Sequence, residues 1–236
     1  MTDPKEKPEE ASGVIEAAEW MTVSRDAIAK DLLATRLRQA RIPKKFLSKT
    51  IDGFHADIKA RKEVVKAARD YVSYFCMNKG ERVDGVLLQG RVGSGKTHVA
   101  VGMLREIIDH GHTGLYCNVP EFFKEVRATY GAISGPDESE LIDETRGADI
   151  LVLDDLGVEG RILDPVRDRS KWLCERLYLI INGRYEADKP IIVTTNCSLE
   201  SLTGQLDERT VSRLLEMTRR RFAVFPDADY RKMHLK

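Results

Sequence analysis

The chain has 236 residues, in which 38 Lys and Arg balance 38 Asp and Glu, and 42% of the residues are hydrophobic. This length fits one large domain or a medium domain with an appendage, and the apolar content excludes wholesale disorder. No apolar run approaches the roughly 18 residues of a membrane span, and the charged N-terminus is unlike a signal peptide. The four cysteines form no CxxC pair, which argues against a zinc site or a disulfide framework. We therefore expect a cytoplasmic protein with reduced cysteines and no membrane partner.

The balanced net charge hides an uneven distribution along the chain. Between Arg36 and Arg69, 11 basic residues face 3 acidic ones, whereas residues 81–205 carry 14 basic and 21 acidic residues. A basic flank beside an acidic core is typical of a protein that touches a polyanion with one face. A solvated helix surface explains the same pattern, and charge alone leaves both interpretations open.

The N-terminal part of the chain predicts helices rather than strands. Residues 1–12 are polar with two prolines, which predicts a disordered tail. Residues 13–53 form a helical N-terminal segment, in which Ser24 could cap a helix that runs to Ile42 before Pro43 ends it. A further helix over about 56–76 opens the main domain, which we place at 54–236.

From Asp84 onward, short apolar runs alternate with helical patterns. The predicted strands are 86–88, 115–117, 150–153 and 191–194, and the predicted helices are about 96–110, 119–130, 138–146 and 169–187. This alternation predicts an α/β domain with a mostly parallel sheet flanked by helices. Ligands of such sheets bind beyond the carboxyl ends of the strands, where the polar motifs of this sequence fall.

The segment after the first strand matches the phosphate-binding pattern GxxxxGK[ST]. Its glycines let backbone N–H groups surround phosphate oxygens at the positive end of the following helix. Lys96 would neutralise the β- and γ-phosphates, and the Thr97 hydroxyl would hold Mg²⁺. The predicted cofactors are therefore ATP and Mg²⁺. The candidate nucleotide-binding residues are Gly90, Arg91, Val92, Gly93, Ser94, Gly95, Lys96, Thr97 and His98.

A second strand ends in two carboxylates, Asp154 and Asp155. One can hold the Mg²⁺ shell through water, and the other can orient or deprotonate the attacking water. Asp155 stands where many ATPases have Glu, and its side chain is one carbon shorter. We therefore expect slow basal turnover, or hydrolysis that a partner must complete.

Two more elements carry polar residues suited to a nucleotide. Asn196 follows the strand 191–194 and can hydrogen-bond the γ-phosphate and the lytic water, although a turn-forming Asn is an alternative. Arg209 and Arg213 lie four residues apart and share one helix face. Either they are surface arginines bridging to Glu208 or Glu216, or Arg213 reaches a neighbouring subunit because its own chain offers no useful target.

In this order the four elements resemble an AAA+ ATPase, and in detail the DnaC/DnaI helicase-loader family, which belongs to a DnaC/IstB-like group. The resemblance runs from about Arg41 to Arg231 and is strongest in GRVGSGKTH, ILVLDDLG, RLYLIINGRYEADKPIIVTTN, LDERTVSRLLEM and DADYRK. It implies Mg-ATP binding, self-association through the ATP site, binding of single-stranded DNA, and placement of a hexameric replicative helicase. It also implies that the usual C-terminal helical lid is missing.

The resemblance assigns individual roles. It places Thr97 and Asp154 at the metal, Asp155 in catalysis, and Asn196 as the sensor asparagine. Arg213 matches the arginine finger and Arg231 the second-sensor arginine. Tyr130 stands where relatives have an aromatic residue that stacks on a DNA base, and Lys124 and Arg127 on the same helix could hold phosphates.

We expect an ATP-hydrolysing DNA replication protein that loads a helicase. An IstB-like transposition helper that acts on duplex DNA shares the same core and is the nearest alternative. A third hypothesis is a binding module that ATP switches with negligible turnover.

Overall fold

The computed structural model describes residues 27–78, 80–131, 134–157, 169–219 and 221–226. The tail predicted over residues 1–12, the loop over 158–168 and the candidate Arg231 lie outside these residues.

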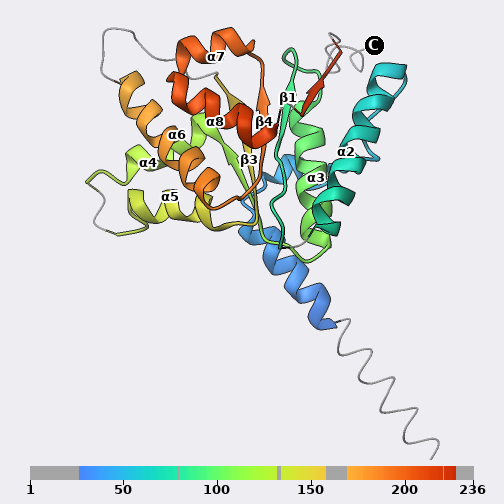
Figure 1. The fold of residues 1–236 in the computed structure, drawn as a ribbon. Coiled ribbons are helices and arrows are strands. Elements are labelled where there is room, and N and C mark those ends of the chain that lie inside the picture. The colour runs from blue at the N-terminus through green and yellow to red at the C-terminus, as the bar shows by residue number, and fades with distance from the viewer. Residues whose placement is uncertain (1–26, 79, 132–133, 158–168, 220, 227–236) are drawn as a thin grey trace, which may run out of the picture.

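A five-stranded parallel sheet forms the centre of the molecule, in the order β2-β3-β4-β1-β5 (Figure 1). Its strands are β1 (Val86–Gln89), β2 (Gly114–Asn118), β3 (Ile150–Leu156), β4 (Ile191–Thr195) and β5 (Phe222–Val224). The predicted strands are confirmed. β1 lies between β4 and β5, and β2 forms one edge.

Helices cover both faces of the sheet. They are α2 (Lys59–Met77), α3 (Lys96–Asp109), α4 (Val119–Ala128), α5 (Glu138–Gly147), α6 (Arg169–Glu186), α7 (Leu199–Gln205) and α8 (Glu208–Thr218), with a 3-10 turn η1 at Lys44–Phe46. The predicted helices are confirmed within a few residues, and the fold class is the predicted α/β class. The short elements η1, α7 and β5 were not predicted.

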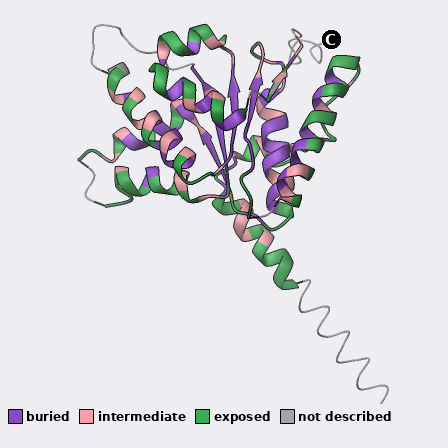
Figure 2. Ribbon diagram, viewed as in Figure 1, coloured by how far each residue is buried: buried purple, intermediate pink, exposed green. Residues whose placement is uncertain are grey.

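Two apolar clusters form the core, one on each face of the sheet. Side chains alternate along a strand, so Val86 and Leu88 pack with α2 and α3 whereas Leu87 packs with α4, α6 and α8. Strands with both faces covered read as continuous apolar runs, and Figure 2 shows the sheet buried between its helices.

The N-terminal segment packs against the domain by its second half. A helix over residues 27–39 projects from the body (Figure 1, blue). After it the chain lies against the sheet edge, where the Tyr116 N–H donates to the Ala40 carbonyl at 2.8 Å. Ile51 and Phe54 then join the core beside α3, which approaches so closely that a Cβ on Gly102 would lie 2.7 Å from the Ile51 nitrogen.

Candidate functional site

The phosphate loop connects β1 to the N-terminus of α3. Gly93 and Gly95 have φ angles of 81° and 97°, which only glycine adopts easily. Gly95 is also the N-cap of α3, and a Cβ there would lie 2.4 Å from a ring carbon of Phe54. Both the backbone conformation and the close packing therefore require glycine at position 95.

Lys96, the first residue of α3, lies inside the loop and is 5% exposed. Its Nζ donates to the carbonyl oxygens of Gly90 and Arg91 at 2.8 and 2.9 Å, and to Asn196 Oδ1 at 2.6 Å. The structure thus brings together two predicted site residues that lie 100 residues apart in the sequence. Ionised phosphate oxygens are stronger acceptors for an ammonium group than neutral carbonyls.

The residues of the phosphate loop are suited to bind a nucleotide phosphate. The Ser94 Oγ is buried and has no hydrogen-bond partner among the described residues, which leaves a donor available inside the loop. The loop also opens a 14-residue helix, whose N-terminal N–H groups favour an anion. Arg91 and Val92 are exposed at the loop surface, and His98 bonds the Thr50 carbonyl through Nε2 at 2.9 Å.

Asp154 is 1% exposed and accepts hydrogen bonds on both carboxylate oxygens. Oδ1 accepts from the hydroxyls of Thr97 at 2.8 Å and Thr194 at 2.7 Å. Oδ2 accepts from the Tyr116 hydroxyl at 2.6 Å and from Asn118 Nδ2 at 3.4 Å. Because Thr97 gives its hydrogen to Asp154, its lone pairs stay available for a cation, which fits the predicted Mg²⁺.

Three of these partners were not predicted from the sequence: Tyr116, Asn118 and Thr194. Each lies at or near the carboxyl end of a strand next to β3, and Asn118 is directly in register with Asp154. Burial, followed by the neighbouring carboxylates, raises the pKa of Tyr116 far above its ordinary value, so the phenol stays protonated and donates. The only sequence signal was a polar side chain at a strand end.

Asp155 lies in a local irregularity of β3. The pairing of β3 with β4 shifts register between Leu153 and Leu156, and Asp155 has a φ of 62°, which Asp tolerates better than most residues. Asn118 Nδ2 lies 3.3 Å from the Asp155 carboxylate and 3.4 Å from that of Asp154. The bulge therefore lets two consecutive carboxylates share one donor.

Arg213 contacts two aromatic rings of its own chain. Its guanidinium lies 5.0 Å from the ring centre of Tyr178 and 5.3 Å from that of Tyr185, both on α6. Among the described residues it forms no ion pair with Glu208 or Glu216, and its Nη1 is buried without a hydrogen-bond partner. The stacking holds the side chain but supplies no anion. Arg209, one turn earlier, is exposed.

The candidate DNA-binding residues lie around the end of α4. Tyr130 is 55% exposed and follows the helix, rather than closing it. Its hydroxyl donates to Glu138 and accepts from Trp172 Nε1 at 2.9 Å. The Arg127 guanidinium lies 4.9 Å from the Trp172 ring, whereas Lys124 is exposed and paired with Glu121.

Trp172 on α6 is the residue that sequence analysis missed at this surface. Arg176 also lies over its ring, at 4.8 Å. Phe122 and Phe123, neighbours of Lys124, are buried in the core and present no surface for a base. The structure thus gathers two aromatic rings and two guanidinium groups at one place.

Comparison with known proteins places the chain among IstB-like ATP-binding proteins. The model of the IstB-like ATP-binding protein family matches residues 22–218. The replicative helicase loader DnaC of Escherichia coli strain K12 is 24% identical over 165 residues, which cover 70% of this chain and 62% of DnaC. The phage-like element PBSX protein XkdC of Bacillus subtilis strain 168 is 25% identical over 179 residues, covering 74% of this chain and 63% of XkdC. The chain therefore spans less than two thirds of these relatives.

The fold agrees with this family match. The crystal structure of the DnaC helicase loader matches with a TM-score of 0.63 and 25% identity, over 78% of this chain and 100% of that chain. Among the described residues, no helix is both long and apolar enough to cross a bilayer. With its phosphate loop, its paired aspartates and the AAA+ fold, the chain belongs to the family of IstB-like ATP-binding proteins.

Proposed function

We propose that the protein is a DnaC-like ATPase that helps place a replicative hexameric helicase on single-stranded DNA. The observation that carries the ATPase part is the hydrogen-bonded set Lys96–Asn196 and Thr97–Asp154 at the carboxyl end of a parallel sheet. The loader part is supported by the match to DnaC over most of this chain. We assign the ATPase to residues 54–236 and propose that it works in the cytoplasm.

The residues of the site have distinct tasks in ATP hydrolysis. Backbone N–H groups of the loop and the Ser94 hydroxyl bind phosphate oxygens, and Lys96 exchanges its loop carbonyls for them. Asp154 orients the Thr97 hydroxyl, so that this oxygen can ligate Mg²⁺. When bound, Mg²⁺ neutralises charge that develops on the phosphate oxygens.

Asp155 and Asn196 act on the water. Asp155 accepts its proton, and Asn196 orients it against the terminal phosphate. Asp155 reaches less far than Glu, so turnover by a single chain is slow. A neighbouring subunit completes the site with Arg213, and Arg231 belongs to the same set as a second-sensor arginine. What supports this is that the Arg213 guanidinium is held by Tyr178 and Tyr185 and, among the described residues, pairs with no carboxylate, which leaves its charge for an anion.

Single-stranded DNA binds at the Tyr130–Trp172 surface. Stacking of bases on exposed aromatic rings is worth about 1–3 kcal/mol per base and tolerates any sequence. Arg127 lies over Trp172 and supplies positive charge for the backbone, whereas the charge of Arg176 is already balanced by Glu138 and Glu175. Lys124 adds less, because Glu121 already balances its charge.

A second candidate function is that of an IstB-like transposition helper that acts on duplex DNA. The specific observation in its favour is the family match itself, which covers residues 22–218. A third, an ATP-switched binding module with negligible turnover, is favoured by the short side chain of Asp155.

Fluorescence anisotropy with labelled single-stranded and duplex oligonucleotides tests the proposal. Binding is measured with and without Mg-ATP across a salt series, with Lys96→Ala as the control. A loader binds the single strand preferentially, with an affinity that depends on both ATP and salt concentration. Lys96→Ala should lose the dependence on ATP and keep the dependence on salt. Preference for duplex favours the transposition helper. Unchanged nucleotide affinity in Lys96→Ala contradicts the assignment of the phosphate loop.

A further inference from the structure

Tyr116 contacts both the N-terminal segment and the candidate metal site. It lies on the edge strand β2 and is 5% exposed. Its backbone N–H donates to the Ala40 carbonyl at 2.8 Å, and its ring lies 6.3 Å from that of Phe46 in η1. Its hydroxyl donates to Asp154 Oδ2 at 2.6 Å. One residue, through its backbone and its side chain, therefore connects residues 40–46 to the carboxylate.

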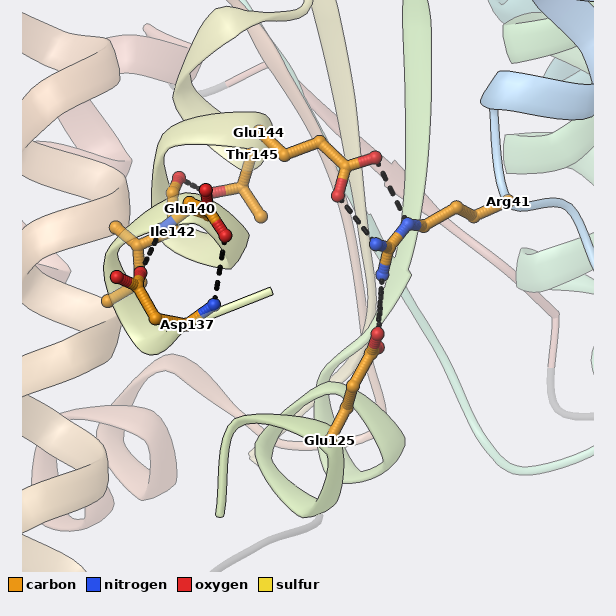
Figure 3. A network of polar contacts seen from close by, with 7 residues as sticks. All are labelled: Arg41, Glu125, Asp137, Glu140, Ile142, Glu144 and Thr145. Carbon is orange, nitrogen blue, oxygen red and sulfur yellow. Dashed lines mark hydrogen bonds and ion pairs between the residues drawn. The ribbon is translucent and has the colours of Figure 1, made fainter. Parts of the chain in front are cut away.

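Residues 40–46 are held beside this tyrosine by burial of Ala40 and Ile42 and by ion pairs of Arg41. Arg41 follows Ala40 and has a φ of 54°. Its guanidinium bonds Glu125 of α4 at 3.0 Å and Glu144 of α5, with a shortest distance of 2.7 Å (Figure 3). Figure 3 shows Arg41 reaching across from the N-terminal segment to the two helices. The position of the segment is thus set by the same helix that leads to Tyr130.

The Tyr116 hydroxyl is the stronger of the two donors to Asp154 Oδ2. Among the described residues, the other donor to this oxygen is Asn118, at 3.4 Å. A short hydrogen bond to an ionised oxygen is about twice as strong as a neutral one. Without it, Oδ2 keeps among the described residues the longer bond from Asn118, while Oδ1 still accepts from Thr97 and Thr194. The carboxylate is then anchored less firmly and orients the Thr97 hydroxyl less well.

We propose that Tyr116 is a positioning residue for Asp154, and that through it the Thr97–Asp154 pair senses where residues 40–46 lie. The inference rests on the proposed ATPase function. A partner that shifts the N-terminal segment would change the Mg²⁺ requirement of the site without touching the nucleotide.

Tyr116→Phe tests the first part, because it removes the hydroxyl and keeps the ring. The measurements are ATP hydrolysis and the affinity for a fluorescent ATP analogue, each as a function of Mg²⁺ concentration. Loss of a group that orients a metal ligand typically costs 10–100-fold in metal affinity, and we expect the half-saturating Mg²⁺ concentration to rise by about 10-fold. Affinity for the analogue without Mg²⁺ stays as in the wild type.

Tyr71→Phe is the matched control. Tyr71 is equally buried, and its hydroxyl has no hydrogen-bond partner among the described residues, so the same deletion leaves the Mg²⁺ dependence unchanged. An unaltered Mg²⁺ dependence in Tyr116→Phe overturns the positioning role. A wild-type protein without hydrolysis contradicts the proposed function instead, and the Mg²⁺ dependence of analogue binding still decides the role of Tyr116.

Arg41→Gln tests the second part. It releases residues 40–46 from Glu125 and Glu144, and we expect the Mg²⁺ requirement to rise about 3-fold in the wild-type background, less than for loss of the hydroxyl itself. In the Tyr116→Phe background it adds nothing, because coupled sites are non-additive. Arg38→Gln, which removes an exposed arginine bonded to Thr35, is the control. Full additivity of Arg41→Gln and Tyr116→Phe overturns the coupling.

Discussion

Arg184 of α6 is completely buried, and its guanidinium serves the backbone rather than a carboxylate. The last carbonyls of a helix have no partner within the helix, and here the end of α5 is bonded by this one side chain. Burial lowers the pKa of Arg184 to about 9, so the group stays protonated at neutral pH. The acceptors are the carbonyl oxygens of Thr145, Arg146, Ala148, Asp149 and Pro190, at 2.7–3.4 Å.

Arg184→Met should therefore destabilise the protein strongly. Each buried carbonyl left without a donor costs about 1–3 kcal/mol, and we expect a total loss of about 3 kcal/mol or more. Urea unfolding measures it, with the exposed Arg209→Met as the control. A loss equal to that of the control would show that water replaces the guanidinium.

Asp155→Asn should separate chemistry from binding. The amide has the same shape and tolerates the same backbone conformation, but it cannot accept a proton from water. We expect hydrolysis to fall about 100-fold or more, with ATP affinity unchanged. Single-turnover hydrolysis and analogue binding measure the two effects, and Asp143→Asn on the surface of α5 is the control. Equal rates for Asp155→Asn and the wild type would remove Asp155 from the mechanism.

The longer elements could be predicted because their apolar patterns match their environment. Ile150–Leu153 is buried on both faces, and its apolar run predicts a buried strand. The continuation of the strand to Leu156 depends on a bulge at two aspartates, which the hydrophobic pattern does not predict. The three residues of β5 are too few to show a period.

The candidate site could be predicted in part for a similar reason. Lys96, Asp154 and Asn196 stand in local motifs whose spacing carries the chemistry. The contacts of Tyr116 and Trp172 form only when distant elements pack, and no residue nearby in the sequence predicts them. The contacts of Arg213 with Tyr178 and Tyr185 were not predicted, because α6 and α8 meet only through tertiary packing.

Gly95→Ala should disrupt the backbone where the phosphate loop enters α3. The left-handed backbone alone costs a residue with a Cβ about 1–2 kcal/mol, and the contact with Phe54 adds to this. Gly131→Ala is the matched control, since Gly131 has a φ of 87° and nothing within 4 Å of its Cβ position. We expect Gly95→Ala to lose more stability than the control and to lose ATP binding. Thermal unfolding and analogue titration test this, and equal losses in both variants would contradict it.

The proposed sharing of the ATP site between subunits would make hydrolysis a property of the assembly. Arg213→Ala should spare ATP binding and lower turnover, since an arginine from a neighbour can be worth about 10³–10⁵ in rate. Mixing Arg213→Ala with Asp155→Asn should restore hydrolysis, because some interfaces then combine an intact arginine with an intact aspartate. Either variant alone is the control. A mixture as inactive as its components would contradict the shared site.

The place of β1 in the sheet governs when this protein can fold. β1 is made early, yet its two neighbours, β4 and β5, come near the end of the described chain, with Val86 paired to Ile192 and Leu87 to Phe222. Pairings between such distant segments close slowly. During synthesis, the phosphate loop therefore lacks its supporting strands until β4 and β5 have left the ribosome. The nascent protein cannot gain stability from ATP before then, and its apolar strands are exposed to aggregation for that interval.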